Sequence, residues 1–175
     1  MPNPAALQHL IDQIRTASQA RTPLQLRGGG SKDFVGTIQP AQLLDTRGYA
    51  GILDYAPSEL VVTVAAGTPL HELEATLAAQ GQCLPFEPPH FTWSGAGATV
   101  GGTVASGLAG PARATVGSVR DYVLGVRMVN GLGEHLTFGG QVIKNVAGYD
   151  VSRLMVGTMG TLGLITEVSL KVLPV

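Results

Sequence analysis

The chain has little of what disulfide, metal or thiol chemistry requires. It contains one cysteine, Cys83, which has no partner for an internal disulfide, a redox dithiol or a cysteine-rich metal site. We interpret Cys83 as a buried small side chain. No Ser-His-Asp arrangement and no cluster of metal ligands is recognisable in the sequence, so no metal is expected.

Charge and long apolar runs are also scarce. Charged residues make up 13% of the sequence, the net charge is −1, and the eleven Lys and Arg residues are dispersed. Because nucleic-acid binding requires a basic face, no nucleic-acid partner is expected. The first twenty residues carry Asp12 inside an apolar pattern, which predicts neither a signal peptide nor a membrane span. A cytoplasmic location is the resulting expectation.

Glycine, by contrast, is abundant. Of the 175 residues, 24 are glycine, about twice the average usage. Most of them lie between residues 95 and 163, where they alternate with Val, Ala and Thr and predict tight turns inside an ordered sheet. A hydrophobic content of 45% is enough for one compact domain with a substantial core.

The first half of the chain predicts helices that alternate with short strands. Asn3 and Pro4 begin an amphipathic helix that ends before Arg21. A second helix is expected over residues 69–80, where Gly81 ends it. The predicted strands are 23–28, 51–55 and 60–67, and the last is apolar nearly throughout, as in a fully buried strand.

The second half has the patterns of an antiparallel sheet. Residues 122–138 contain two strand-like runs joined through Asn130 and Gly131, a hairpin signal. Residues from Leu164 to Val172 alternate between apolar and polar and predict a late strand. The expected fold class is therefore α+β. We expect a small parallel βαβ lobe at about residues 1–67 and a mixed or antiparallel lobe, flanked by helices, at about 68–175.

Two glycine clusters are candidates for binding phosphate, LRGGGSK at residues 26–32 and GAGATVGGTVASGLAG at 95–110. Neither is a P-loop or a dinucleotide fingerprint. In the first cluster the lysine follows serine, and Asp33 stands where the fingerprint requires glycine. The second has Gly95 and Gly97 but then Val100.

Both clusters nevertheless have the composition of an anion nest, in which successive backbone N–H groups converge on negative oxygens. Ser31 and Thr103 add hydroxyl donors, and a short helix after Thr99 would favour phosphate at its start. One such loop alone would be read as a tight turn. Two of them, on separate lobes, predict a diphosphate between them.

Four stretches that span nearly the whole chain resemble the FAD-binding domain shared by relatives of vanillyl-alcohol oxidase and p-cresol methylhydroxylase (PCMH-type). They are LRGGGSKDFVG, ELVVTVAAGTPLHELEATLAAQGQCLPFEPP, ATVGGTVASGLAGPARATVGSVRDYVLGVRMVNGLGE and GTMGTLGLITEVSLKVLP. Within that family, FGGQVIKNVAGYDVSRLMVG is similar to the FAD-binding subunits of bacterial glycolate oxidases (glycolate dehydrogenases). The resemblance implies a two-lobed PCMH-type fold and an FAD-dependent oxidoreductase that acts on the CH–OH group of a 2-hydroxy acid, with glycolate oxidised to glyoxylate.

The resemblance also implies which residues bind FAD. The first cluster is expected to hold the pyrophosphate, and the second to run along the diphosphate toward the flavin. The turn at 117–121 and the strand start at 163–165 are expected to flank the cofactor. The implied FAD-binding residues are Arg27, Gly28, Gly29, Gly30, Ser31, Lys32, Thr99, Val100, Gly101, Gly102, Thr103, Ser106, Gly107, Gly117, Ser118, Asp121, Gly163, Leu164 and Ile165.

Some relatives attach FAD covalently through a histidine or a cysteine. The first cluster contains neither, and Cys83 lies away from the matching loops, so the resemblance implies non-covalent FAD. His90 is the histidine close to the second cluster. We interpret it as a packed or capping residue rather than an attachment point or a general base.

Oxidation of a 2-hydroxy acid requires a cation for the carboxylate, a base for the hydroxyl proton and a hydride acceptor. Relatives that oxidise D-2-hydroxy acids often carry Arg-Lys-x-x-Thr-Gly-Tyr-Asp near the flavin. This chain has the lysine and the Gly-Tyr-Asp, but Ile143 and Ala147 replace the arginine and the threonine. Lys144 is therefore the catalytic candidate, and a solvent-facing lysine is the alternative.

The resemblance further implies partners. The full subunit would act beside a second flavin subunit and an iron–sulfur subunit, associated with the inner face of the membrane through them. Family members usually continue into a substrate-binding cap, which we expect to be absent because the sequence stops at Val175. Two other functions stay open: a flavin-binding electron-transfer or scaffold subunit, and a relative of UDP-N-acetylmuramate-forming reductases.

Overall fold

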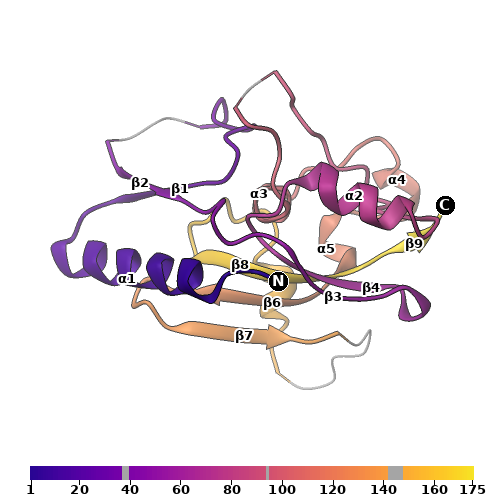
Figure 1. Cartoon of the computed structure of the whole chain (residues 1–175). Helices are drawn as coiled ribbons and strands as arrows, with labels where there is room; N and C mark the ends of the chain where they lie inside the picture. Colours follow the sequence, from indigo (N-terminus) through magenta and orange to yellow (C-terminus); the bar gives the residue numbers. More distant parts are fainter. Residues whose placement is uncertain (37–39, 94, 142–147) are drawn as a thin grey trace.

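A five-stranded antiparallel sheet with the order β3-β4-β8-β6-β7 forms the centre of the molecule (Figure 1). The computed structural model describes residues 1–36, 40–93, 95–141 and 148–175. The strands of the sheet are β3 (Ile52–Ala56), β4 (Val61–Ala65), β6 (Val123–Val129), β7 (His135–Gly139) and β8 (Leu164–Lys171).

The central strand β8 is buried on both faces, with seven of its eight residues buried. The sequence pattern predicts an alternating strand with one polar face. The polar residues Thr166, Glu167 and Ser169 are nevertheless buried, because other elements cover both sides of β8. A strand that has neighbours on both edges and is covered on both faces has no solvent-exposed side, even if its residues alternate between apolar and polar.

Helices pack against one face of the sheet and form the larger part of the core. They are α2 (Leu70–Ala78), α3 (Val100–Ser106), α5 (Val119–Tyr122) and α6 (Val151–Leu154). On the opposite face, α1 (Pro4–Ala20) covers the start of β8, where Leu164 clusters with Leu10 and Ile14. Burial of this apolar surface is the main force that holds these layers together.

The parallel part of the fold is small. Strand β1 (Leu24–Arg27) pairs in parallel with β2 (Gln42–Asp45), and no helix is found among the described residues between them. The predicted parallel lobe thus contributes one parallel pair without a helical crossover, whereas β3 and β4 join the antiparallel sheet. The α+β class is confirmed.

The predicted helices and the hairpin are present with small shifts. Helix α1 begins at Pro4, capped by the Asn3 side chain, which accepts a hydrogen bond from the Ala5 N–H. The β6–β7 turn is longer than Asn130 and Gly131 alone. It spans residues 130–134, and the Asn130 side chain accepts bonds from the N–H groups of Leu132 and Glu134.

The remaining elements in the described part of the chain are short: the 3-10 turn η1 (Pro57–Glu59), helix α4 (Arg113–Val116) and the strands β5 (Gln82–Cys83) and β9 (Leu173–Pro174), which pair with each other. Cys83 is half-buried on β5. In the part of the chain that the structure describes, no helix is long and apolar enough to cross a bilayer.

Candidate functional site

The two glycine clusters are in direct backbone contact. We call residues 28–36 loop A and residues 87–93 with 95–99 loop B. The Ala96 N–H donates a hydrogen bond of 2.6 Å to the Gly29 carbonyl. A Cβ on Gly29 would overlap the Gly97 carbonyl oxygen, and a Cβ on Gly95 would overlap that of Gly29. Glycine is therefore required here for the two main chains to meet.

Loop A presents a set of unused backbone donors. In the described part of the chain, the N–H groups of Gly28, Gly29, Ser31 and Lys32 donate to no acceptor. Gly29 and Ser31 are buried. Since buried N–H groups are nearly always paired, such a row of donors indicates an anion site.

Arg27, at the end of β1, holds loop A in shape by contacting Asp33. Its Nε and Nη2 atoms lie 2.7 and 2.6 Å from Oδ2 of Asp33, and this carboxylate raises the pKa of Arg27. A Cβ on Gly30 would overlap the guanidinium. The role of Asp33 could not be predicted, because nothing in the order of residues shows that loop A folds back onto Arg27.

Lys32 is the positive charge of loop A that remains available. It has no carboxylate partner among the described residues. Its Nζ lies 3.5 Å from Oγ of Ser31, and burial lowers the pKa of the lysine. An anion bound by the N–H groups of loop A would supply a negative charge to pair with this half-buried lysine.

Helix α3 begins after Thr99, as predicted, but its first N–H groups are already used. Val100 and Gly101 donate to the carbonyls of Thr68 and Ala66 at 2.9 and 2.8 Å, and Gly102 donates to Oγ1 of Thr99 at 3.3 Å. The start of α3 is thus anchored to the turn after β4. Donors that are bonded internally are not free for phosphate, so these three N–H groups are occupied in this structure.

Thr103 offers a different contribution. Its Oγ1 is buried and has no hydrogen-bond partner in the described part of the chain. A hydroxyl without a partner carries the cost of its lost hydration. This orphaned hydroxyl could therefore be satisfied by a polar ligand.

The far end of α3 packs against the chain that precedes β8. The Ser106 hydroxyl donates to the Thr103 carbonyl, and Gly107 caps the helix in a left-handed conformation. A Cβ on Gly107 would come within 3.1 Å of the Gly157 Cα. Both residues therefore have a local structural role.

The turn at 117–121 forms its own hydrogen bonds. Asp121 Oδ2 accepts from the N–H of Ser118 at 2.7 Å and from its hydroxyl at 3.0 Å, which caps α5. These bonds lower the pKa of Asp121. Gly117 supplies a positive φ of 96°. In this structure the three residues serve a helix start.

The segment 163–165 belongs largely to the core. Leu164 and Ile165 are buried on opposite sides of β8, in the two hydrophobic clusters. Gly163 has a φ of +145°, and a Cβ there would overlap the Met128 side chain. Only the backbone at this position is therefore available to a ligand.

An aromatic surface that was not predicted joins loop A to loop B, and it is formed by Phe34, Phe91 and Trp93. The ring centroids of Phe34 and Phe91 lie 5.3 Å apart, and those of Phe91 and Trp93 lie 5.0 Å apart, both edge-to-face. Lys32 Nζ lies 5.7 Å from the centroid of Phe91. Aromatic residues in irregular loops leave no periodic signal by which to predict such contacts.

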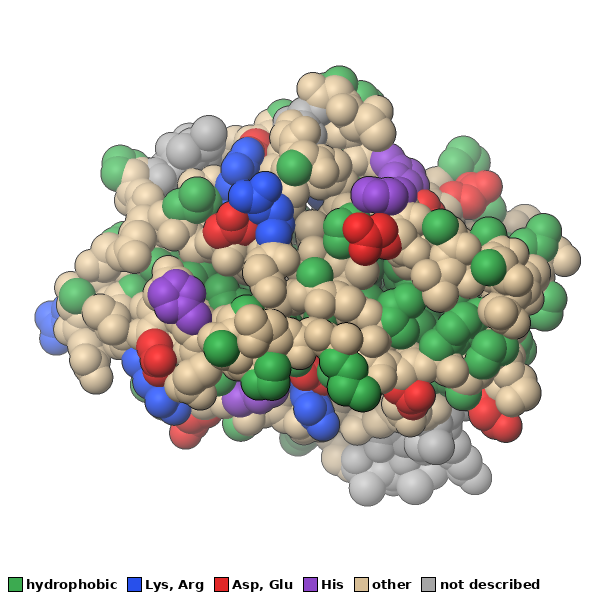
Figure 2. Space-filling model, viewed as in Figure 1, with side chains coloured by type: hydrophobic (Ala, Val, Ile, Leu, Met, Phe, Trp, Pro, Cys, Tyr) green, Lys and Arg blue, Asp and Glu red, His purple; other side chains and the backbone are tan. Residues whose placement is uncertain are grey.

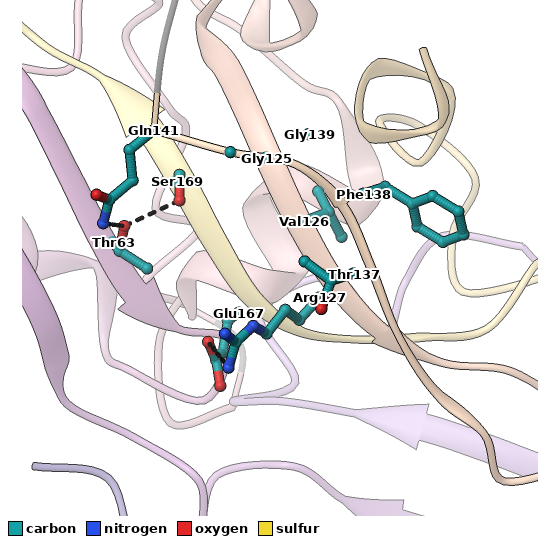
Figure 3. Close-up of a pocket in the computed structure, with 11 residues that line it drawn as sticks. Thr63, Gly125, Val126, Arg127, Thr137, Phe138, Gly139, Gln141, Glu167 and Ser169 are labelled. Atoms are coloured by element: carbon teal, nitrogen blue, oxygen red, sulfur yellow. Dashed lines mark hydrogen bonds and ion pairs between the residues drawn. The ribbon is translucent and has the colours of Figure 1, made fainter. Parts of the chain in front are cut away.

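A separate pocket of about 170 Å³ lies on the sheet, between strands β4, β6, β7 and β8 (Figure 3). Its polar side chains pair with one another. The hydroxyl oxygens of Thr63 and Ser169 are 2.9 Å apart, and the side-chain amide of Gln141 donates to the Thr63 hydroxyl. Nη1 of Arg127 lies 3.4 Å from Oε2 of Glu167. No residue of loop A or loop B lines this pocket.

His90, the histidine close to the second cluster, contacts a carboxylate. His90 Nε2 lies 2.9 Å from a carboxylate oxygen of Glu74, which agrees with a structural role. Among the described residues, no group of His, Cys, Asp and Glu could hold a metal ion. Lys144, the catalytic candidate, lies outside the described residues. On the face shown in Figure 2, basic side chains lie beside acidic ones.

Comparisons with known proteins agree with this geometry. A family model described as an FAD binding domain matches residues 3–153. The glycolate oxidase subunit GlcE of Escherichia coli (strain K12) is 55% identical over 95% of this chain and 47% of its own length. GlcD of Bacillus subtilis (strain 168) is 32% identical over 94% of this chain and 35% of its own length.

Other similar proteins extend the same group. A D-lactate dehydrogenase of Anaerostipes hadrus is 35% identical over 91% of this chain and 31% of its own length. The solved structure of an alkyldihydroxyacetonephosphate synthase, 24% identical, superposes with a TM-score of 0.71 over 96% of this chain and 32% of its own. This chain thus spans about half or less of the relatives that it matches.

The chemistry of loop A suits the diphosphate of a dinucleotide, since it combines the N–H groups of Gly28, Gly29, Ser31 and Lys32, a hydroxyl, and a lysine without a carboxylate partner among the described residues. The family model covers most of the chain, and it includes both loops. The chain therefore belongs to the family of FAD-binding domains, and its cofactor is FAD.

Proposed function

We propose that this chain is the FAD-binding part of a flavin-dependent 2-hydroxy-acid dehydrogenase, with glycolate as the foremost substrate. The observation that carries the proposal is the 55% identity to a glycolate oxidase subunit over nearly the whole chain. FAD would accept the hydride that leaves the substrate carbon bearing the hydroxyl. The protein's part is to bind and orient this cofactor.

The diphosphate of FAD would lie on loop A. The N–H groups of Gly28, Gly29 and Ser31 and the Lys32 ammonium would contact its oxygens, while Arg27 keeps the loop in shape through Asp33. Thr103 offers a further hydroxyl. We propose that this binding is non-covalent, because loop A contains neither histidine nor cysteine.

An absorbance spectrum recorded before and after acid precipitation tests this. We expect a flavin spectrum that moves entirely to the supernatant, where chromatography identifies FAD. A flavin that stays in the pellet would contradict non-covalent binding. A colourless protein that takes up no added FAD would contradict the proposal itself.

Partner subunits are also part of the proposal. Two of the relatives above are named as subunits of a glycolate oxidase, which supports assembly with other subunits. We propose a second flavin subunit and an iron–sulfur subunit as electron acceptors, and an association with the inner face of the membrane through them. Co-purification with a tagged chain, followed by iron and flavin analysis, would detect both partners.

Anaerobic mixing with glycolate separates a dehydrogenase from a flavin-binding electron-transfer or scaffold subunit. We expect glycolate to bleach the flavin absorbance of the assembled complex. If only the partner's flavin is reduced by substrate, this chain serves electron transfer. The similarity to glycolate oxidase and D-lactate dehydrogenase proteins argues against the muramate-forming reductases.

A further inference from the structure

The aromatic surface of Phe34, Phe91 and Trp93 is costly for the chain to expose. Trp93 is the single tryptophan of the sequence and is 76% exposed, and Phe34 is 56% exposed. Large aromatic side chains are normally buried, and an exposed cluster of them marks a binding surface. The diphosphate contacts proposed above leave this surface without a ligand.

The position of the aromatic surface restricts what can bind it. Lys32 lies between the two features, with its Nζ 3.5 Å from the Ser31 hydroxyl and 5.7 Å from the centre of the Phe91 ring. A ligand on the donors of loop A would therefore continue onto the rings. Its matching chemistry is a phosphate group linked to a flat, largely apolar ring system.

FAD has two such rings, and the exposure of the surface distinguishes them. The isoalloxazine ring must remain reachable for a substrate and for an electron acceptor, whereas the adenine ring takes no part in the reaction. Because Phe34 and Trp93 lie at the protein surface, a ring placed against them keeps one side accessible.

We propose that Phe34 and Trp93 bind the isoalloxazine ring of FAD, while loop A holds the diphosphate. This inference rests on the proposed function, since it assumes that FAD is the ligand. In this proposal the aromatic side chains of Phe34 and Trp93 bind the flavin and also join loop A to loop B. Phe91, which contacts both other rings, holds them in position.

Calorimetric titration of the flavin-free protein with FAD and with ADP tests the assignment. Trp93→Leu and Phe34→Leu are each expected to weaken FAD binding about 3- to 10-fold, the effect of one lost aromatic contact. ADP affinity is expected to stay unchanged, because ADP carries the diphosphate and the adenine but no flavin. Leu132→Ala, at another exposed apolar side chain in the β6–β7 turn, is the matched control.

The emission of bound flavin gives an independent readout. An indole in contact with the isoalloxazine ring quenches its fluorescence by donating an electron to the excited ring. We expect Trp93→Phe, which keeps an aromatic contact but is a poorer electron donor, to retain FAD affinity and to raise the emission of bound FAD several-fold. Thermal unfolding of each variant verifies that the fold is intact.

The outcomes separate this inference from the proposed function. Wild-type protein that binds FAD, together with variants that bind it equally well and keep its emission low, would overturn the ring assignment alone. An equal loss of ADP and FAD affinity in Trp93→Leu would place the adenine ring there and would also overturn it. Wild-type protein that binds no FAD would overturn both.

Discussion

At the scale of single residues, two basic side chains of the same segment serve different purposes. Arg27 is held by Asp33 at hydrogen-bond distance, so its charge is already compensated within the protein. Lys32 is half-buried without a carboxylate partner among the described residues. The family resemblance implied FAD binding for both residues, and the sequence does not show which basic side chain meets a carboxylate in the folded loop.

Lys32→Met is therefore expected to weaken the binding of inorganic pyrophosphate and of FAD by about tenfold, equivalent to one charged hydrogen bond of roughly 1.4 kcal/mol. Lys171→Met, at a lysine on β8, provides the matched control and should bind normally. Calorimetry measures both. Equal affinities of the Lys32 variant and the wild type would contradict the assignment of this charge.

The titration of Lys32 adds a pH dependence. Burial lowers the pKa of Lys32, so the free protein loses this charge at a lower pH than an ordinary lysine would. Pyrophosphate affinity should consequently fall as the pH rises toward the ordinary lysine pKa, and Lys32→Met should lack this fall. An identical pH profile for both proteins would rule out the mechanism.

Gly29→Ala tests the contact between the two loops. A Cβ at Gly29 would overlap the Gly97 carbonyl, so we expect a loss of about 1–3 kcal/mol in the free energy of unfolding, typical of overpacking. Gly131→Ala has open space around its Cβ and is the control. Urea denaturation compares the two, and similar stabilities would show that the loops separate easily.

At the scale of elements, the start of α5 shows how a predicted ligand can have a structural role. Ser118 and Asp121 form a reciprocal cap, and Gly117 provides the conformation that precedes it. This pattern of glycine, serine and aspartate is visible in the sequence. The role of these residues cannot be predicted from the pattern, since the same groups suit either a helix cap or the binding of a polar ligand.

Asp121→Ala should lower the free energy of unfolding at neutral pH by about 0.5–2 kcal/mol, as is usual for a lost cap. The hydrogen bonds from Ser118 lower the pKa of Asp121 in the folded state, so its stabilisation is present above the ordinary carboxyl pKa and lost as the pH falls through the lowered value.

Acid titration of stability checks this. The loss of stability that the wild type shows as Asp121 is protonated in acid should be absent from both Asp121→Ala and Asp121→Asn. The Asn variant still keeps a side-chain acceptor for the cap. If FAD affinity falls in Asp121→Asn without any change in stability, the residue is a ligand rather than a cap.

Strands differ in how much of them the sequence reveals. The long apolar or alternating runs of β4, β6 and β8 were predictable, because burial imposes a period on them. The four residues of β2 carry no such period: Leu44 is buried, yet Leu43 is 49% exposed. Strand β2 forms because its backbone pairs with β1. This pairing depends on the tertiary fold and leaves no pattern in the local sequence.

At the scale of the whole molecule, one buried hydrogen bond connects the segment before β3 to the centre of the sheet. The Tyr49 hydroxyl donates to Oε1 of Glu167 at 2.7 Å, and burial together with this carboxylate raises the pKa of Tyr49. Glu167 is 4% exposed, and its other contact, with Arg127, is longer at 3.4 Å. Without Tyr49 the carboxylate would be poorly compensated.

Tyr49→Phe is expected to destabilise the protein by about 1–3 kcal/mol, because it leaves a buried charged acceptor without its donor. Tyr55→Phe removes a hydroxyl that donates to the neutral Gln82 side chain, and should cost less. Chemical denaturation followed by circular dichroism compares them. A smaller loss for Tyr49→Phe than for Tyr55→Phe would contradict this account of Glu167.

The central place of β8 has a consequence for how the protein is made. The ribosome synthesises β3, β4, β6 and β7 before β8, yet β8 lies between β4 and β6 and pairs with both. The turn that anchors α3 also depends on it, because the Ala66 N–H bonds to the Thr166 carbonyl. A nascent chain must therefore carry two unjoined hairpins with apolar faces until residues 164–171 emerge, and only then can the sheet close and fix the anchor of α3.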